Sequence, residues 1–266
     1  MSNFDIPKFQ CTEFSEKNFD YCVCVFVINE GDRLLNQLKE MSQLALQADI
    51  VISDGGSTDG STNTDLLKSY GVNSLLVKDD SGKLGSQMRI AFSWAMKRGY
   101  KGVVVIDGNN KDSVIDINEF VLKLSEGWDH VQGSRFIPGG EAINTPITRL
   151  LGVKLIHAPL MRLASGFHYT DTTNGFRAYS MSFLLNRNVG LFRSVFTGYE
   201  LHYYLARTAP RLKFKCIEIP VTRKYPQDGG LPTKITPIQG NFNVLKKLFS
   251  VVFGKYDLKN TVRGKS

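Results

Sequence analysis

The first half of the chain alternates short apolar runs with stretches of helical periodicity, and this alternation limits the folds that the sequence can adopt. Apolar runs occupy residues 21–28, 49–53, 73–78 and 102–106, and patterns of helical spacing separate them. Strands that alternate with helices in this way predict a mostly parallel sheet with helices on both faces. In such a sheet, ligands bind beyond the carboxyl ends of the strands. We therefore predict an α/β fold with its site at that edge.

The second half of the chain is less regular. Residues 128–136 and 212–221 predict two further strands, and a helix is expected near 199–207. The apolar segment 146–167 should break or bend at Pro159, because proline lacks the backbone N–H that a helix uses. The sequence contains no repeat, low-complexity stretch or clear linker, so one main domain is expected.

Positive charge concentrates toward the C-terminus. The formal net charge is +8, and residues 201–266 hold 13 Lys and Arg against three acidic residues. This imbalance indicates an anionic partner, such as phosphate groups, nucleic acid or an acidic membrane surface, or else a solvated basic tail. No aromatic-basic RNA-binding motif is present, so nucleic acid is not the expected partner.

Two features of the sequence concern location. No run reaches the roughly 18 apolar residues that a membrane-spanning helix needs. The N-terminus lacks a basic start followed by an apolar stretch, so a secretion signal is not expected. We therefore predict a cytoplasmic protein.

The segment DGGSTDGS, residues 54–61, follows the second predicted strand. Its glycines permit a tight turn, and Ser57, Thr58 or Asp59 suits the N-cap of a following helix. The start of that helix could also hold an anion, but an acid at Asp54 would repel a phosphate placed against it. Asp54 is better suited to accept hydrogen bonds from a nucleobase or a ribose hydroxyl.

The tripeptide Asp107-Gly108-Asn109 follows the fourth predicted strand. An aspartate and an asparagine two residues apart on an extended strand end can point to one side and offer oxygen ligands. Mg²⁺ or Mn²⁺ that bridges a diphosphate needs few protein carboxylates, because phosphate oxygens complete the coordination. The alternative is an Asx turn that caps the next helix.

Together these segments resemble a known family. IVISDGGSTDGS is similar to the second-strand signature of inverting family-2 glycosyltransferases of the GT-A fold, and VFVINE is similar to the end of their first strand. VVVIDGN falls at the place of their D-x-D metal motif. QGSRF, DTTNGFRAYS and FKCIEIPVTRKYP match, in order, the later part of members similar to dolichol-phosphate mannose synthase. The resemblance implies a GT-A domain over residues 21–235, an N-terminal extension over 1–20, and a basic amphipathic helix and tail over 236–266.

The resemblance also implies a donor site with three departures from the family pattern. Gly55 replaces the second acid of a D-D pair, and Asn109 replaces the second acid of the metal motif. Lys111 stands where many polyprenyl-phosphate members have glutamine. Mg²⁺ or Mn²⁺ on Asp107 and Asn109 is therefore expected to bind more weakly, with Lys111 contacting the diphosphate. The donor-binding residues that the resemblance implies are Asn29, Glu30, Asp54, Gly55, Lys83, Asp107, Lys111, Arg177 and Lys234.

The acceptor stays open between a lipid-linked phosphate and a saccharide hydroxyl. The leaving diphosphate needs a cation, and Arg135 in the Gly-Ser-Arg turn matches a basic position of the family. A hydroxyl acceptor needs a general base, for which Glu200 and then Asp171 are the candidates. A lipid phosphate is already an anion and needs no base, and Arg177 and Lys234 would hold it. The Q-x-x-R-W pattern of processive synthases is absent, so one sugar per encounter is expected.

Two other functions compete with a transferase of surface-glycan or polyprenyl-phosphate-sugar synthesis. A sugar-phosphate nucleotidylyltransferase also has an α/β sheet and a metal, but its glycine-rich basic loop near the N-terminus is missing. A non-catalytic basic module for membranes or nucleic acid is the other alternative.

Residues 238–252 place apolar side chains at helical spacing beside Lys246 and Lys247. This helix either packs onto the domain or lies with segment 146–167 in a membrane interface, and we expect peripheral attachment at the cytoplasmic face.

Overall fold

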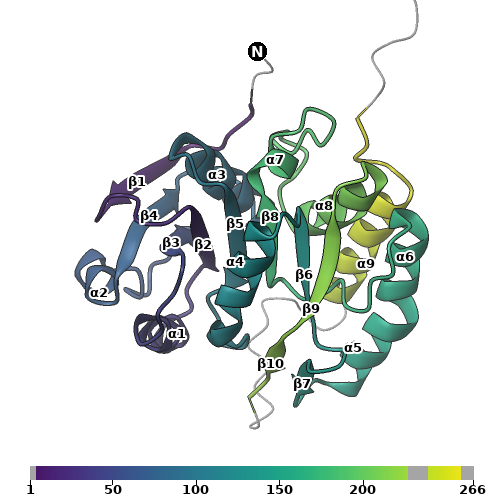
Figure 1. Ribbon diagram of the computed structural model, residues 1–266, viewed down its shortest axis with the longest axis horizontal. Helices are drawn as coiled ribbons and strands as arrows, with labels where there is room; N and C mark the ends of the chain where they lie inside the picture. Colours follow the sequence, from purple (N-terminus) through teal and green to yellow (C-terminus); the bar gives the residue numbers. More distant parts are fainter. Residues whose placement is uncertain (1–3, 227–238, 259–266) are drawn as a thin grey trace, which may run out of the picture.

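Eight strands form one sheet at the centre of the structure, a computed structural model that describes residues 4–226 and 239–258. Their spatial order is β1-β4-β3-β2-β5-β8-β6-β9 (Figure 1). The bounds of these strands are β1 (Phe9–Glu13), β2 (Tyr21–Val27), β3 (Asp49–Asp54), β4 (Val72–Lys78), β5 (Gly102–Asp107), β6 (His130–Ser134), β8 (Arg177–Ser180) and β9 (Cys216–Pro220).

Most neighbouring strands of the sheet run parallel. β2 pairs in parallel with β3 and β5, β3 with β4, and β6 with β9. The exceptions are β1 at one edge and β8 inside the sheet, which run antiparallel to their neighbours. The predicted α/β fold with a mostly parallel sheet is confirmed.

The central strand β2 is buried on both faces, and its sequence explains why. Alternate side chains of a strand point to opposite faces, and β-branched residues fit such a pleated, packed surface. Val23, Val25 and Val27 belong to the apolar core on one face, whereas Cys22 and Cys24 belong to the core on the other. Burial of each valine stabilises the fold by about 1.5–3 kcal/mol. The two cysteines are free and buried, as small core residues.

Helices cover both faces of the sheet. On the face of Val23 lie α1 (Asp32–Ser42), α2 (Thr64–Ser69), the short η1 (Val114–Asp116) and α4 (Ile117–Ser125). On the opposite face lie α3 (Leu84–Lys97), α6 (Ala158–Ser165), α7 (Met181–Leu184), α8 (Glu200–Arg211) and α9 (Gln239–Val252). The helices α6, α8 and α9 also pack against one another.

The segment predicted to break at Pro159 stays helical in the structure. α5 (Ile147–Gly152) continues through the π-helical turn η2 (Val153–His157) into α6, and Pro159 lies at the start of α6. A π-helical turn shifts the backbone hydrogen-bonding pattern, so it suits the position just before a residue that has no N–H to donate. The expected alternatives were a break or a bend at Pro159, and the break does not occur; a π-helical turn precedes the proline instead.

Segments near both ends of the chain pack onto the main domain. The strand β1, within the predicted N-terminal extension, pairs with β4 at the edge of the sheet. In α9, Leu248 and Val251 are buried in the core, whereas Phe253, just after α9, is 81% exposed.

Near α5, β7 (Glu141–Ile143) and β10 (Thr222–Lys224) form a small parallel sheet (Figure 1). None of the helices in the described residues reaches the length and apolarity that crossing a bilayer would require.

Candidate active site

The ends of three neighbouring parallel strands bring the polar motifs together. In the register of the sheet, Asp54 of β3 lies opposite Val27 of β2. Asp107 of β5 lies opposite Phe26 on the other side of the same strand. The two aspartates therefore flank the carboxyl end of β2, where Asn29 and Glu30 follow.

Asp54 organises the loop that follows β3. It is 2% exposed. One of its carboxylate oxygens accepts hydrogen bonds from the N–H of Gly56 (3.1 Å) and from the N–H and hydroxyl of Ser57 (2.9 and 2.7 Å). The other accepts from the Thr62 hydroxyl at 3.1 Å. These contacts form the expected tight turn, but the N-cap of α2 is Asn63 and not Ser57, Thr58 or Asp59. A nucleotide contact by Asp54 stays a prediction.

The loop after β2 is tied to the same segment. Asn29, which has a positive φ of 49°, accepts a hydrogen bond from the N–H of Thr58 at 2.7 Å. Its own N–H donates to the Ser57 hydroxyl at 2.9 Å. The neighbouring Glu30 forms an ion pair with Arg33, with 2.9 Å between Nη2 and Oε2. Asn29 and Glu30 therefore shape the rim of the site.

Gly55 leaves little room for a side chain, and Lys83 contributes a backbone hydrogen bond. A Cβ atom at Gly55 would lie 3.2 Å from the Cβ of Ile28 and 3.3 Å from the amide nitrogen of Gln87. A side chain at position 55 would therefore require Ile28 or Gln87 to shift by a small distance. Lys83 is exposed, and its backbone N–H donates to the carbonyl of Thr197 at 2.7 Å, which joins the start of α3 to the loop before α8.

Asp107 and Asn109 fit a single divalent ion. The Asp107 side chain is 32% exposed, and its Oδ2 accepts a hydrogen bond from the Asn109 amide at 3.4 Å. The Oδ1 atom of Asn109 is buried and has no hydrogen-bond partner. A Cβ at Gly175 would lie 3.4 Å from Asp107 Oδ1, so the glycine leaves space in front of the carboxylate. Since the described residues contain no group of three or more His, Cys, Asp and Glu suited to a metal, phosphate and water oxygens would have to supply the other ligands.

A residue that the motifs did not reveal, Arg223 of β10, also reaches Asp107. Its Nη2 lies 3.5 Å from Asp107 Oδ2, and its Nη1 forms an ion pair with the buried Asp112. Burial disfavours the charged guanidinium, but Asp112 and Asp107 outweigh this effect and raise the pKa of Arg223 above its usual value. The arginine is therefore a fixed positive charge beside the candidate metal ligand.

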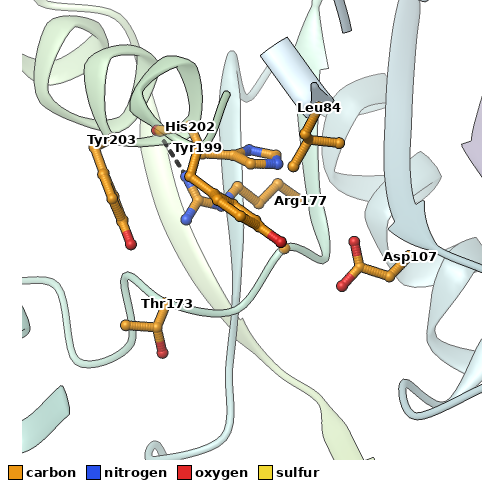
Figure 2. A pocket seen from close by; sticks show the side chains of 8 residues that line it. Leu84, Asp107, Thr173, Arg177, Tyr199, His202 and Tyr203 are labelled. Atoms are coloured by element: carbon orange, nitrogen blue, oxygen red, sulfur yellow. Dashed lines mark hydrogen bonds between the residues drawn. The ribbon is translucent and has the colours of Figure 1, made fainter. Parts of the chain in front are cut away.

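A pocket opens next to Asp107. Figure 2 shows the hydroxyl end of Tyr199 directed toward the Asp107 carboxylate, with His202 and Arg177 behind it. Burial, and then the charge of Asp107, raise the pKa of Tyr199 to about 12, so its phenol stays protonated and can donate a hydrogen bond. The residues that line the pocket are Leu84, Asp107, Thr173, Gly175, Arg177, Tyr199, His202 and Tyr203.

His202 is a neutral side chain of this pocket. Burial, and then the charges of Arg177 and His130, hold the pKa of His202 well below its usual value. One ring nitrogen, Nδ1, lies 3.3 Å from the hydroxyl of Tyr179. Sequence reasoning predicted the helix α8, but the pattern did not show which of its polar residues face the pocket.

Arg177 lines the pocket and also has a structural role. Its three guanidinium nitrogens donate to the carbonyl oxygens of Asn174 (2.9 Å), His202 (2.8 Å) and Thr172 (2.7 Å). It is 1% exposed. These bonds hold the 172–174 loop against α8, and a phosphate contact by Arg177 stays a prediction. Lys234, its expected companion, lies outside the described residues.

The two carboxylates considered as general bases are both occupied. Asp171 is fully buried and forms a bidentate ion pair with Arg135, with 2.6 Å from Nε to Oδ2 and 3.0 Å from Nη2 to Oδ1. Glu200 is 1% exposed and pairs with Lys247 of α9. Neither carboxylate lines the pocket. The geometry therefore does not favour the expectation of an accessible base at Glu200 or Asp171, and Arg135 is placed to hold Asp171.

Cations gather around one aromatic ring beside the pocket. Lys111 Nζ lies 5.1 Å from the centre of the Tyr225 ring, and the guanidinium carbons of Arg149 and Arg223 lie at 5.5 and 5.8 Å. Arg149 also donates a hydrogen bond to the Tyr225 hydroxyl at 2.6 Å. Burial would raise the pKa of Tyr225, but Arg223, Arg149 and Arg135 outweigh burial and lower it. This cluster of Lys111, Arg149, Arg223 and Tyr225 is suited to bind phosphate groups.

Comparison with known proteins finds similar sequences among glycosyltransferases. The chain is 27% identical over 203 residues to a polyprenol monophosphomannose synthase of Mycolicibacterium smegmatis, covering 75% of this chain and 76% of that protein. It is 27% identical over 197 residues to an undecaprenyl-phosphate mannosyltransferase of Micrococcus luteus, covering 73% and 79%. It is 25% identical over 228 residues to the glycosyltransferase AglJ of Haloferax volcanii, covering 86% and 70%. No model of a protein family matches the sequence.

A solved structure shares the fold. The glucosyl-3-phosphoglycerate synthase of Mycobacterium tuberculosis, in complex with Mn²⁺, uridine diphosphate and phosphoglyceric acid, superimposes with a TM-score of 0.60. The match covers 91% of this chain and 80% of that one at 15% identity. The predicted GT-A fold and the predicted resemblance to polyprenyl-phosphate glycosyltransferases are both confirmed.

Proposed function

We propose that this chain is a glycosyltransferase that transfers one sugar from a nucleotide-diphosphate sugar to a lipid-linked phosphate. Its GT-A fold and its similarity, over most of its length, to polyprenyl-phosphate mannosyltransferases support the proposal. The observation that carries the proposal is the distribution of charge around Asp107. Arg223 lies beside Asp107, and Lys111 and Arg149 surround the Tyr225 ring together with it, whereas the two other candidate carboxylates, Glu200 and Asp171, are held in ion pairs. This arrangement suits an acceptor that is already an anion.

The donor diphosphate binds at the ends of β2, β3 and β5 in this proposal. Asp107 and Asn109 hold Mg²⁺ or Mn²⁺, whose chemistry is to neutralise the diphosphate as it leaves. Lys111 and Arg223 add fixed positive charge on the same side. Tyr199, with its raised pKa, stays protonated and donates a hydrogen bond near Asp107.

The acceptor phosphate binds against the cluster of Lys111, Arg149, Arg223 and Tyr225. An oxygen of this phosphate attacks the anomeric carbon of the sugar, and the bond from that carbon to the diphosphate oxygen breaks. The nucleoside diphosphate leaves with the bonding electrons, and no proton needs to be removed from the acceptor. A direct displacement of this kind inverts the configuration at the anomeric carbon.

The lipid portion of the acceptor calls for contact with a membrane. Apolar side chains of α5, η2 and α6 point to solvent, with Ile147 73%, Leu155 70% and Leu163 83% exposed. Phe253, just after α9, is 81% exposed. In this proposal, these side chains enter the interface of a membrane at its cytoplasmic face, and the basic residues beside them contact anionic head groups.

The test is a transfer assay with defined acceptors. The protein is incubated with a panel of nucleotide sugars, Mn²⁺ and either a polyprenyl phosphate or a soluble saccharide, and the lipid and saccharide products are identified by mass spectrometry. A glycosylated polyprenyl phosphate that is absent with Asp107→Asn is the expected result. Transfer to the saccharide alone would overturn the lipid-phosphate acceptor, and the coupling constant of the anomeric proton tests inversion.

A further inference from the structure

Arg223 connects a buried carboxylate to the candidate metal ligand. The arginine is 7% exposed, and its partner Asp112 is 4% exposed. Nη1 of the guanidinium pairs with Asp112, while Nη2 lies 3.5 Å from Oδ2 of Asp107. The backbone supports this placement, because Asp112 and Arg223 also form an isolated antiparallel bridge. One end of the guanidinium is thus anchored by Asp112, and the other approaches the Asp107 carboxylate.

Asp107 already has positive charge beside it without a metal ion. Asp107 and Asp112 contribute two negative charges, whereas Arg223, Lys111 and Arg149, which surround the Tyr225 ring, contribute three positive charges. A second acid of the metal motif would have added negative charge, but position 109 is an asparagine. Lys111 and Arg223 lie over the same ring, with Lys111 Nζ 5.1 Å and the guanidinium carbon of Arg223 5.8 Å from the centre of Tyr225. A divalent ion therefore enters a site without net negative charge.

We propose that Arg223 is the internal counter-ion of Asp107 and competes with the divalent ion for that carboxylate. The competition is direct, because the guanidinium approaches the same carboxylate group that would coordinate the ion. Arg223 thereby makes the free protein a weak metal binder, and the negative charge of a nucleoside diphosphate offsets Arg223 and Lys111 when the donor arrives. The inference deepens the proposed function and rests on it only in taking Asp107 as the metal ligand.

A purely structural role for Arg223, as the partner of Asp112 alone, gives a different expectation. In that case Arg223 would fill the core beneath β10 without affecting cations at Asp107. Removal of Arg223 by itself would leave Asp112 as a buried unpaired carboxylate, which is costly to the fold. The informative comparison is therefore between Asp112→Asn and the double variant D112N/R223Q, since these two proteins differ only at position 223 and neither contains that unpaired carboxylate.

The experiment measures binding of Mn²⁺ alone, with no nucleotide or acceptor, from the electron paramagnetic resonance signal of free Mn²⁺. We expect D112N/R223Q to bind Mn²⁺ at least about fivefold more tightly than D112N, because one competing positive charge beside Asp107 is gone. D107N should weaken binding in every background. Arg223→Lys, which keeps the charge next to Asp112 but has no second nitrogen for Asp107, should also bind Mn²⁺ more tightly than the wild type. Folding of the variants is checked by circular dichroism. If the Asp112 variants do not fold, the comparison of Arg223→Lys with the wild type provides the test.

Equal Mn²⁺ affinities of D112N and D112N/R223Q would overturn the proposal, as would weaker binding by the double variant. Absence of Mn²⁺ binding by all variants at millimolar concentrations would overturn it too. Because no sugar transfer is measured, a wrong assignment of the acceptor would leave these affinities unchanged. Failure of the inference and failure of the proposed function are thus distinguishable.

Discussion

Lys247 of α9 forms an ion pair with Glu200, the first residue of α8. The other oxygen of the Glu200 carboxylate accepts hydrogen bonds from the N–H groups of Thr197 and Gly198, both at 2.6 Å. Burial would raise the pKa of Glu200, but Lys247 and the backbone N–H groups outweigh burial and lower it. Glu200 thus joins α9 to the loop at the rim of the pocket, and both of its oxygens are used in this role.

Glu200→Gln should therefore affect stability more than catalysis. Loss of the charged hydrogen bonds is expected to lower the free energy of unfolding by about 1–3 kcal/mol. With a polyprenyl phosphate acceptor, kcat should fall by less than about tenfold, whereas loss of a general base costs about 10²–10⁴. Urea unfolding measures the change in unfolding free energy, and steady-state kinetics measures the change in kcat. Lys247→Met is the matched control, since it removes the same ion pair without touching the carboxylate, and a loss of kcat confined to Glu200→Gln would restore Glu200 as the base.

Substitutions at the end of β5 should separate the charge of the metal site from its geometry. Asp107→Asn is expected to abolish turnover with little change in melting temperature, because this side chain is partly exposed and outside the core. Asn109→Asp restores a second acid beside Asp107 and should lower the Mn²⁺ concentration needed for half-maximal rate by roughly tenfold, the effect of about 1.4 kcal/mol of added attraction. The transfer rate of each variant is measured as a function of Mn²⁺ concentration. An Asn109→Asp enzyme that needs more Mn²⁺ than the wild type would contradict the assignment of this ligand.

The ion pair of Arg135 and Asp171 should be important for folding. Both side chains are nearly or fully buried, at 2% and 0% exposure, so Arg135→Met leaves an uncompensated carboxylate in the core. Loss of one partner of a buried pair is expected to cost about 3–5 kcal/mol of unfolding free energy. The double variant R135M/D171N should recover part of that loss. Denaturant unfolding of the three proteins gives the comparison, and similar stability of the wild type and R135M would show that the pair is dispensable.

The sequence predicted the sheet and the strand-end motifs because both depend on local patterns. An apolar run followed by polar residues marks a buried strand and its exposed end, as for β5 and Asp107. The tight turn after β3 was likewise predicted from its glycines, because the contacts that form it, from Asp54 to Gly56 and Ser57, lie within three residues.

The pairing of charged residues could not be predicted in this way. Arg223 lies 116 residues from Asp107, and Lys247 lies 47 residues from Glu200. No local pattern specifies such contacts, which arise when β10 and α9 pack against the main sheet and its helices. The hydrogen bonds of Arg177 to three backbone carbonyls were likewise not predictable, because they form only when the 172–174 loop packs against α8.

Stability should fall with acidification in part through His157. Burial lowers the pKa of His157 to about 4, with Asp171 acting in the opposite direction. Between pH 6.5 and 4 the unfolded chain therefore binds more protons at this position than the folded chain does. The contribution is complete above pH 6.5 and is lost as the pH falls toward 4, up to about 3 kcal/mol. His157→Gln should flatten the dependence of unfolding free energy on pH in this window, and identical pH profiles of variant and wild type would rule out this origin.

Membrane contact should depend on the exposed apolar face of α5, η2 and α6. Leu155 and Leu163 are 70% and 83% exposed there, and burial of each in a membrane interface is favourable. Lys154 adjoins Leu155, and each basic residue near an anionic surface adds about 1 kcal/mol. We expect the wild type to float with anionic liposomes at low salt and less at high salt, whereas the double variant L155E/L163E should stay in the soluble fraction.

The matched control for this prediction is Ile115→Glu. Ile115 is 69% exposed but belongs to η1, which packs on the opposite face of the sheet from α6. A charge at this position should leave flotation unchanged, because Ile115 faces away from the proposed membrane. Equal loss of flotation in Ile115→Glu and L155E/L163E would indicate a general effect of charge. Recovery of all the wild-type protein in the soluble fraction, with anionic and with neutral liposomes, would refute membrane attachment and favour a soluble saccharide acceptor, since a lipid-linked phosphate is reached only at a bilayer surface.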